Sequence, residues 1–160
     1  CSSDLLHGKK TGLPPRMDLE VAKTLHTTLL GLIHTGEVKS AHDCSEGGLA
    51  VALAEGCIAQ QTARETPRLI GAQVDLSATK DVRLDALLFG ETQNRIVITC
   101  APLNATKVIE RAKLMGVPAV RLGTVGGDKL TVKTASGEFT APVAELHGAW
   151  WNSIARAMGA

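Results

Sequence analysis

The sequence predicts an α+β fold in which a mixed β-sheet is flanked by helices, arranged as an α/β sandwich. Three observations support this. Helix-like and strand-like hydrophobic periods alternate along the chain, as they do in βα units. Two strand candidates flank a Gly-Gly-Asp turn at residues 126–128, which is typical of a hairpin. With 160 residues, of which 44% are hydrophobic, the chain is long enough to bury one core.

The first third of the chain predicts a linker, two helices and a strand. Residues 1–17 are irregular and rich in Gly, Lys and Pro, so we interpret them as a linker and residues 18–160 as one domain. Asp18 caps a helix that ends at Gly36. Its expected buried positions have a helical period: Val21, Ala22, Leu25, Leu29 and Ile33. A short strand follows at 38–42, and residues 47–60 predict a helix apolar on nearly all sides.

The remaining elements follow from the same rules. The expected order is a loop at 61–68, a strand at 70–77, a short helix at 81–91, an apolar central strand at 94–101, and a helix from Asn104 to Gly116. A strand at 119–125 and a half-buried strand at 129–135 follow, with another turn at 136–139. The final helix, 142–158, presents one apolar stripe: Val143, Leu146, Trp150, Ile154 and Met158.

Composition excludes several classes of function. The formal net charge is +1 and the basic residues are scattered, which argues against a nucleic-acid partner. Aromatic residues make up 2% of the chain, too few for base-stacking platforms. No apolar stretch has transmembrane length, and no signal peptide precedes the four widely spaced cysteines, so we expect a cytoplasmic protein with reduced thiols. Because the chain opens at Cys1 without Met, we expect an excised fragment.

The densest polar cluster is "HDCSEGG" at residues 42–48. His42, Asp43 and Cys44 are consecutive, and neighbouring side chains in an extended segment point to opposite faces. They therefore cannot converge on one metal ion, and they lack the spaced ligand pairs that zinc requires. A Cys–His nucleophile has no orienting third group here, so we assign no catalytic residue and no metal ligand in this cluster.

Two interpretations of this cluster stay open. Gly47 and Gly48 begin a helix after a strand, and the free N–H groups and dipole of a helix start attract anions such as phosphate. Asp43 and Glu46 add negative charge, so they could instead cap the helix, bind a ligand hydroxyl or meet a bridging cation. A plain strand-to-helix turn capped by Ser45 or Asp43 explains the same residues equally well.

A second polar segment, "LFGETQNRIVIT" at residues 88–99, leads into the apolar strand. Glu91, Gln93 and Arg95 alternate, so in an extended conformation they project from one face. An acid, an amide and a guanidinium so aligned can bind a hydroxylated or phosphorylated ligand. An ordinary Glu–Arg pair at a sheet end is the alternative.

Four segments resemble one enzyme family, formylglycinamide ribonucleotide amidotransferase, also called phosphoribosylformylglycinamidine synthase. "AHDCSEGGLAVALAE" is similar to its "AHDxSxGGLxxALAE" pattern and "LFGETQNRIVIT" to its "LFGExQxRxxx" pattern. "GVPAVRLGTVGGDKLTV" and "SSDLLHGKKTGLPPRMDL" resemble two more of its segments, in the family's order. The departures, at Cys1, Asp4 and Leu5, are confined to the extreme N-terminus. The matching region is the C-terminal domain of the synthetase subunit in the short form of the enzyme.

The resemblance implies a fold of the aminoimidazole ribonucleotide synthetase C-terminal-domain type, partly ferredoxin-like, preceded by an ATP-type domain. It implies an ATP-dependent C–N ligase of purine biosynthesis that uses ATP and Mg²⁺ in the full-length enzyme, with neither bound tightly here. Implied partners are the upstream domains, a glutaminase subunit, a small accessory subunit and a ribonucleotide substrate. The matching positions would line a cleft as binding or supporting residues: His42, Asp43, Ser45, Gly47, Gly48, Glu91, Gln93 and Arg95. The fragment alone should be inactive.

Two other classes of function compete with this one. Aminoimidazole ribonucleotide synthetase, selenophosphate synthetase, thiamine-phosphate kinase and the hydrogenase-maturation enzyme share the architecture and ATP chemistry, but their strand-to-helix turns differ. A non-catalytic module that binds nucleotide or a partner protein through the same cleft is the second alternative.

Overall fold

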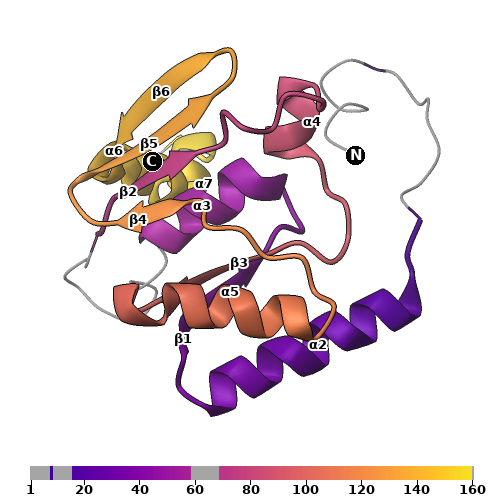
Figure 1. Cartoon of the computed structure of the whole chain (residues 1–160). Coiled ribbons are helices and arrows are strands. Elements are labelled where there is room, and N and C mark those ends of the chain that lie inside the picture. Colours follow the sequence, from indigo (N-terminus) through magenta and orange to yellow (C-terminus); the bar gives the residue numbers. More distant parts are fainter. Residues whose placement is uncertain (1–7, 9–15, 59–68, 160) are drawn as a thin grey trace. The chain divides into compact units, whose positions relative to one another are not determined.

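The computed structural model describes residue 8 and residues 16–58 and 69–159. The predicted linker, 1–17, lies outside the described residues except for Gly8, Arg16 and Met17, and the predicted loop at 61–68 lies outside them entirely. The chain forms two compact units, whose helices and strands are labelled in Figure 1. The first unit comprises Cys1–Ala52 and Leu88–Arg121, and the second comprises Leu53–Leu87 and Leu122–Ala160.

The first unit is built around a two-stranded antiparallel ribbon. Strand β1 (Val38–Asp43) pairs with β3 (Ile96–Cys100), with Asp43 opposite Ile96. Two helices belong to the same unit, α2 (Leu19–His34) and α5 (Ala105–Leu114), the latter entered through a 3₁₀ turn, η2 (Pro102–Asn104). Helix α3 (Gly48–Ile58) begins in this unit and α4 (Leu84–Phe89) ends in it.

Helix α2 starts where the sequence predicts, but part of its predicted buried face is wrong. The Asp18 carboxylate accepts hydrogen bonds from the amides of Glu20 (3.0 Å) and Val21 (3.1 Å), so Asp18 is the N-cap. Ala22 is buried as expected, whereas Val21 and Ile33 are exposed. The helix buries Thr28 and Leu32 as well. Ile33 is exposed because it lies about 100° around the helix from Leu32.

Strand β3 is not the central strand that its apolar sequence predicts. All five of its residues are only half-buried, and among the described residues its one partner strand is β1. A continuous apolar run is typical of strands covered on both faces. Here the apolar run belongs to a strand of a two-stranded ribbon. The length and composition of the run therefore could not distinguish a central strand from a ribbon strand.

A buried acid ties α5 to the turn between α2 and β1. The Glu37 side chain is 7% exposed and forms ion pairs with Lys107 (2.5 Å) and Arg111 (3.0 Å). The hydroxyl of Thr35 also donates to it, at 3.2 Å. The hydrogen bond from Lys107 is the main reason that the pKa of Glu37 lies below its ordinary value of 4.5, with Thr35 and Arg111 acting in the same direction.

The second unit contains a four-stranded mixed sheet, which confirms the predicted fold class. Its order is β4 (Gly123–Val125), β2 (Ala72–Asp75), β5 (Lys129–Thr134) and β6 (Gly137–Pro142). β2 is parallel to β5 and antiparallel to β4, and β5 and β6 form an antiparallel hairpin. The predicted alternation of β5 is confirmed, since Leu130, Val132 and Thr134 are buried.

Two features at the end of the second unit differ from the sequence prediction. Residues 136–139, predicted as a turn, belong mostly to β6, because the actual turn is shorter and Thr134 pairs with Gly137. The predicted single helix 142–158 is two helices, α6 (Val143–Trp151) and α7 (Ser153–Ala157), separated at Asn152. The apolar period continues through Asn152, so periodicity gave no sign of the break.

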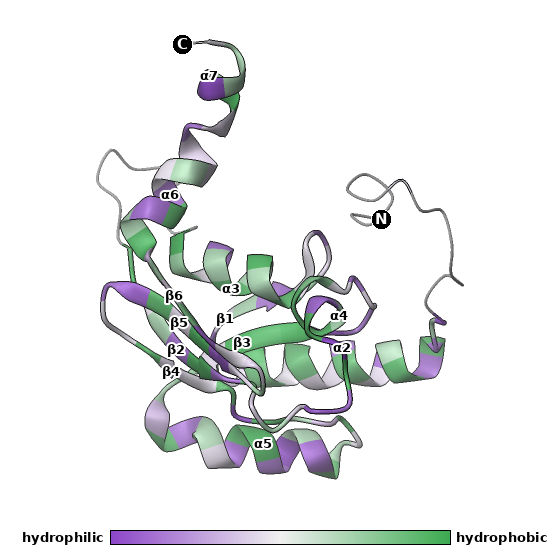
Figure 2. Ribbon diagram, turned by 90° about the horizontal axis from the view of Figure 1, so that it is seen from above, coloured by the Kyte–Doolittle hydropathy of each residue, from purple (hydrophilic) through white to green (hydrophobic). Residues whose placement is uncertain are grey.

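Helix α5 is amphipathic (Figure 2). It buries Val108 and Ala112, while Lys107 and Lys113 are exposed. Asn104 holds the predicted N-cap position, although its side chain makes no capping hydrogen bond. Among the described residues, no helix is both long and apolar enough to cross a membrane.

Replacing the buried acid should destabilise the fold in a pH-dependent way. Glu37→Gln should lower the urea midpoint of unfolding at pH 7, because Lys107 and Arg111 lose their charged partner. The folded-state pKa of Glu37 is depressed, so its contribution is complete above the unfolded-state pKa and is lost as pH falls through the folded-state value. The difference between variant and wild type should therefore shrink below about pH 4.5. Glu110→Gln, at an exposed acid of α5, is the control.

Removing an unpaired buried hydroxyl should stabilise α2. Thr28 is 6% exposed, and its hydroxyl has no hydrogen-bond partner among the described residues. Thr28→Val keeps the shape and should raise the free energy of unfolding by about 1 kcal/mol. The control is Thr24→Val, because that hydroxyl is exposed and donates to the Glu20 carbonyl. A loss of stability in Thr28→Val, measured by urea unfolding, would contradict the expectation.

Candidate functional site

The antiparallel β1–β3 pair brings the two polar segments together. In such a pair the end of one strand lies beside the start of the other, so the turn after Asp43 lies beside the segment before Ile96. The amide of Cys44 extends the pairing by donating to the carbonyl of Arg95, at 2.9 Å. The structure thus joins residues 42–48 and 88–95 in one place, within the first unit.

The Gly-Gly pair allows this close approach. Gly47 and Gly48 have φ of +75° and +68°, values that favour glycine. A Cβ on Gly48 would lie 2.8 Å from the carbonyl oxygen of Gly90 and 2.9 Å from that of Leu88. A Cβ on Gly47 would lie 2.4 Å from a methyl of Val51. Both positions therefore require glycine, Gly48 because the backbone of the second segment lies against it.

A carboxylate occupies the start of helix α3. The amide of Gly47 donates to Oε1 of Glu91 at 3.0 Å, just before α3 begins at Gly48. Negative charge at a helix N-terminus is favourable, so this contact stabilises the turn and links the two segments. The sequence left open whether this helix start binds an anion or is a plain turn. In the structure the Gly47 amide already donates to a carboxylate of the chain itself, that of Glu91.

The segment before β3 bends instead of running extended. Asn94 has a φ of +64°, and β3 begins only at Ile96. The expectation that Glu91, Gln93 and Arg95 alternate along an extended strand is therefore wrong. Arg95 turns back and donates to the carbonyl of Gly90 at 3.1 Å, which helps to hold the bend closed.

Asp43 is the ionised group at the edge of the turn. Its side chain is 67% exposed, and a hydrogen bond from Ser45 is the main reason that its pKa lies below the ordinary value of 3.8. His42 is 35% exposed, and its Nδ1 lies 2.7 Å from the Asp43 carbonyl oxygen. In that contact Nδ1 must carry the proton, because a carbonyl only accepts.

The chemistry of Cys44 is consistent with a structural residue. Cys44 is 3% exposed, and burial raises the pKa of its thiol above 9.0. A buried thiol with a raised pKa is a poor nucleophile. No group of three or more His, Cys, Asp or Glu side chains in the described ranges could hold a metal ion.

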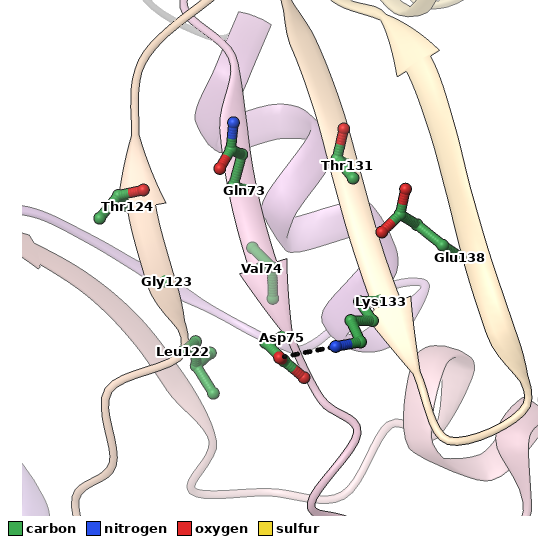
Figure 3. A pocket seen from close by; sticks show the side chains of 9 residues that line it. All are labelled: Gln73, Val74, Asp75, Leu122, Gly123, Thr124, Thr131, Lys133 and Glu138. Carbon is green, nitrogen blue, oxygen red and sulfur yellow. Dashed lines mark ion pairs between the residues drawn. The ribbon is translucent and has the colours of Figure 1, made fainter.

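A pocket of about 540 Å³ lies on the sheet of the second unit (Figure 3). Sequence reasoning did not single out its lining, which comprises Gln73, Val74, Asp75, Leu122, Gly123, Thr124, Thr131, Lys133 and Glu138. Asp75 and Lys133 lie opposite each other on β2 and β5, with Lys133 Nζ 3.7 Å from Asp75 Oδ2. None of the eight predicted site residues lines this pocket, since all eight belong to the first unit. The alternation of apolar and polar residues in β2 and β5 could have predicted that one face of the sheet is polar. It could not have predicted that a pocket lies on that face.

Comparison with known proteins gives concordant matches. The family model described as AIR synthase related protein, C-terminal domain, matches residues 2–134. Phosphoribosylformylglycinamidine synthase subunit PurL of Anaeromyxobacter dehalogenans is 43% identical over 150 residues, covering 92% of this chain and 19% of the relative. The PurL subunit of Thermobifida fusca is 36% identical over 157 residues. The chain thus spans about a fifth of the length of these relatives.

Solved structures share the fold. Thermotoga maritima PurL complexed with FGAR superposes with a TM-score of 0.71 at 22% identity, covering 88% of this chain and 23% of that one. A chain of the T. maritima PurLQS structure gives a TM-score of 0.65 at 22% identity, over 91% of this chain and 24% of that one. Together with the family match over residues 2–134, these findings establish that the chain belongs to the family of AIR synthase related proteins and carries its C-terminal domain.

Proposed function

We propose that this chain is the C-terminal domain of an ATP-dependent ligase of de novo purine biosynthesis. The enzyme would convert formylglycinamide ribonucleotide, ATP and glutamine-derived ammonia into formylglycinamidine ribonucleotide, ADP and phosphate. The observation that carries this proposal is the match of nearly the whole chain to PurL subunits at 35–43% identity. T. maritima PurL, whose fold is similar, has been solved with FGAR, ATP and ADP, which supports the same substrates.

In this reaction ATP would phosphorylate the amide oxygen of the substrate, and ammonia would then displace that oxygen as phosphate. The domain described here would contribute binding groups and no proton-transfer catalyst. Asp43, Ser45 and Gln93 are exposed and carry hydrogen-bonding groups suited to ligand hydroxyls or amides. His42, half-exposed beside Asp43, would join them.

The other four residues would support the site. Gly47 and Gly48 allow the two segments to approach, Glu91 holds the helix start, and Arg95 holds the bend. A phosphate at the amide of Gly47 would have to displace the Glu91 carboxylate, which already accepts from it. We therefore assign this turn to a hydroxyl-bearing part of the substrate and place phosphate binding elsewhere in the enzyme.

ATP and Mg²⁺ would bind mainly in upstream domains of a longer polypeptide, with residues 1–17 as the linker to residues 18–160. We place the enzyme in the cytoplasm, with a glutaminase subunit and a small accessory subunit as partners. The T. maritima PurLQS structure supports an assembly of this kind.

The isolated chain should fold but lack ligase activity. With FGAR, ATP, Mg²⁺ and ammonium chloride, the purified 160-residue chain should release no ADP above a protein-free blank, because most of the relatives' length is missing. Full-length A. dehalogenans PurL, assayed identically, is the positive control. Ammonia-dependent ADP release by the isolated chain would refute the proposal that ATP binding and catalysis require the upstream domains.

Two site variants should impair a full-length enzyme. We would place this chain in A. dehalogenans PurL in place of the matching 150 residues and compare variants with the unmodified chimera. Asp43→Ala and Arg95→Ala should each raise KM for FGAR or lower kcat more than tenfold, a loss of about 1.4 kcal/mol of transition-state stabilisation. An effect on KM alone would indicate binding equal in ground and transition states.

The matched controls are Asp81→Ala and Arg121→Ala, which remove the same charges from exposed positions outside the site. They should leave steady-state kinetics within twofold of the unmodified chimera. If Asp43→Ala and Arg95→Ala both behave like these controls, the two segments do not form a binding site.

A further inference from the structure

A row of charged side chains crosses the pocket of the second unit. Lys133 on β5 lies opposite Asp75 on β2 and opposite Glu138 on β6. Charges of alternating sign therefore follow one another at the spacing of neighbouring strands, about 4.8 Å. We call Asp75, Lys133 and Glu138 the charged row. Because it holds one cation between two anions, neither sign of charge dominates the pocket.

The charged row keeps binding capacity that the chain does not use. Lys133 Nζ is directed to Asp75 Oδ2, but 3.7 Å is too long for a direct hydrogen bond. The other oxygen of Asp75 accepts from the amide and the hydroxyl of Ser77. In Figure 3, Glu138 extends from β6 toward β5, and no described residue pairs with its carboxylate. An ammonium and a carboxylate thus stand ready for a ligand.

A second row in the same pocket is uncharged. Gln73 on β2 lies opposite Thr124 on β4 and opposite Thr131 on β5. Among the described residues, the side chains of Gln73 and Thr124 have no hydrogen-bond partner, whereas Thr131 bonds to Thr140 at 3.0 Å. We call Gln73, Thr124 and Thr131 the neutral row. A primary amide both donates and accepts, so Gln73 can pair with another amide through two hydrogen bonds.

The lining excludes several classes of ligand. A phosphate requires several converging donors, and the one lysine of the lining lies between two carboxylates. A nucleobase gains its affinity by stacking on aromatic rings, and the lining contains none. An apolar ligand would leave the polar groups without hydrogen bonds. A polycation or a polyanion would meet a like charge in the charged row, so a ligand with both charges fits best.

The two rows together match an α-amino acid that has a side-chain amide. An ammonium and a carboxylate on one carbon can face Glu138 and Lys133, which β6 and β5 hold as direct cross-strand neighbours. Thr131 and Lys133 are two residues apart on β5, which separates the rows by about 6.6 Å. An amide two methylene groups from the α-carbon reaches across this distance to Gln73. The pocket volume, about 540 Å³, is within the range of small-molecule sites.

We propose that this pocket binds a free α-amino acid with a side-chain amide. The ammonium of the ligand pairs with Glu138, its carboxylate with Lys133, and its amide with Gln73. The pocket belongs to the second unit and the candidate site to the first, so the proposal does not depend on the proposed reaction. It is therefore tested by binding alone, with L-glutamine as the probe.

Two-dimensional ¹⁵N–¹H NMR of the 160-residue chain measures this binding. L-Glutamine should shift the amide resonances of residues 73–75 and 131–133 saturably, with a Kd on the order of 1 mM. Three analogues each lack one group of the probe: glutaramate lacks the ammonium, 4-aminobutanamide the carboxylate and L-norvaline the amide. Each analogue should bind at least tenfold more weakly, because one row loses its partner.

Two variants assign the charges of the ligand. Glu138→Gln should weaken the binding of L-glutamine about tenfold but should not weaken that of glutaramate, which has no ammonium. Lys133→Met should likewise weaken L-glutamine but not 4-aminobutanamide, which has no carboxylate. The matched controls are Glu110→Gln and Lys113→Met, at exposed positions of α5 outside the pocket. They should leave every Kd unchanged.

The same comparison in the PurL chimera removes any dependence on the isolated chain. Saturation-transfer NMR should detect L-glutamine on the chimera, with a signal that Glu138→Gln reduces and Glu110→Gln does not. The proposal is overturned if the shifts do not saturate by about 50 mM, or if the three analogues bind as well as L-glutamine. It is overturned as well if, in both proteins, the two pocket variants bind the probe like their controls.

Discussion

The antiparallel pairing of β1 with β3 is the constraint on which the candidate site depends. Asp43 and Ile96 are far apart in sequence, and their pairing alone sets the turn after one strand against the segment before the other. The contacts between the two segments follow from that register, including the hydrogen bond from the amide of Gly47 to Glu91 and the approach of the Leu88–Gly90 backbone to Gly48. A slip of one residue would turn each side chain of the strand to the opposite face.

Two charged side chains of the site bond to backbone groups, whereas Glu37 bonds to charged side chains. Glu91 accepts from a main-chain amide and Arg95 donates to a main-chain carbonyl. Such contacts fix the backbone of the two segments, while Asp43 and Ser45 keep their exposed polar groups at the edge. Glu37, by contrast, is held between two basic side chains of α5 and serves packing. The two glutamates thus have different roles: Glu91 fixes a backbone turn, and Glu37 holds a helix through its ion pairs.

Local rules predicted much of the fold, whereas contacts distant in sequence could not be read from periodicity. Asp18 was identified as a cap because capping depends on the next three residues, and the alternation of β5 followed from its own sequence. The half-buried state of β3 depends on having β1 as its partner, and the break at Asn152 interrupts no apolar period. Within the candidate site, residue types indicated two polar clusters, but the bend at Asn94 depends on a positive φ that no sequence pattern predicted.

The contact at Gly48 also limits how the sequences of the two segments can change. Any larger residue there would push a Cβ into the backbone of Leu88–Gly90, so it could be accommodated only if that stretch moved as well. Neither segment can therefore change its backbone path independently of the other. Over evolutionary time they must vary as a single unit, and a substitution at Gly48 should survive only together with a compensating change in the loop that leads to Glu91.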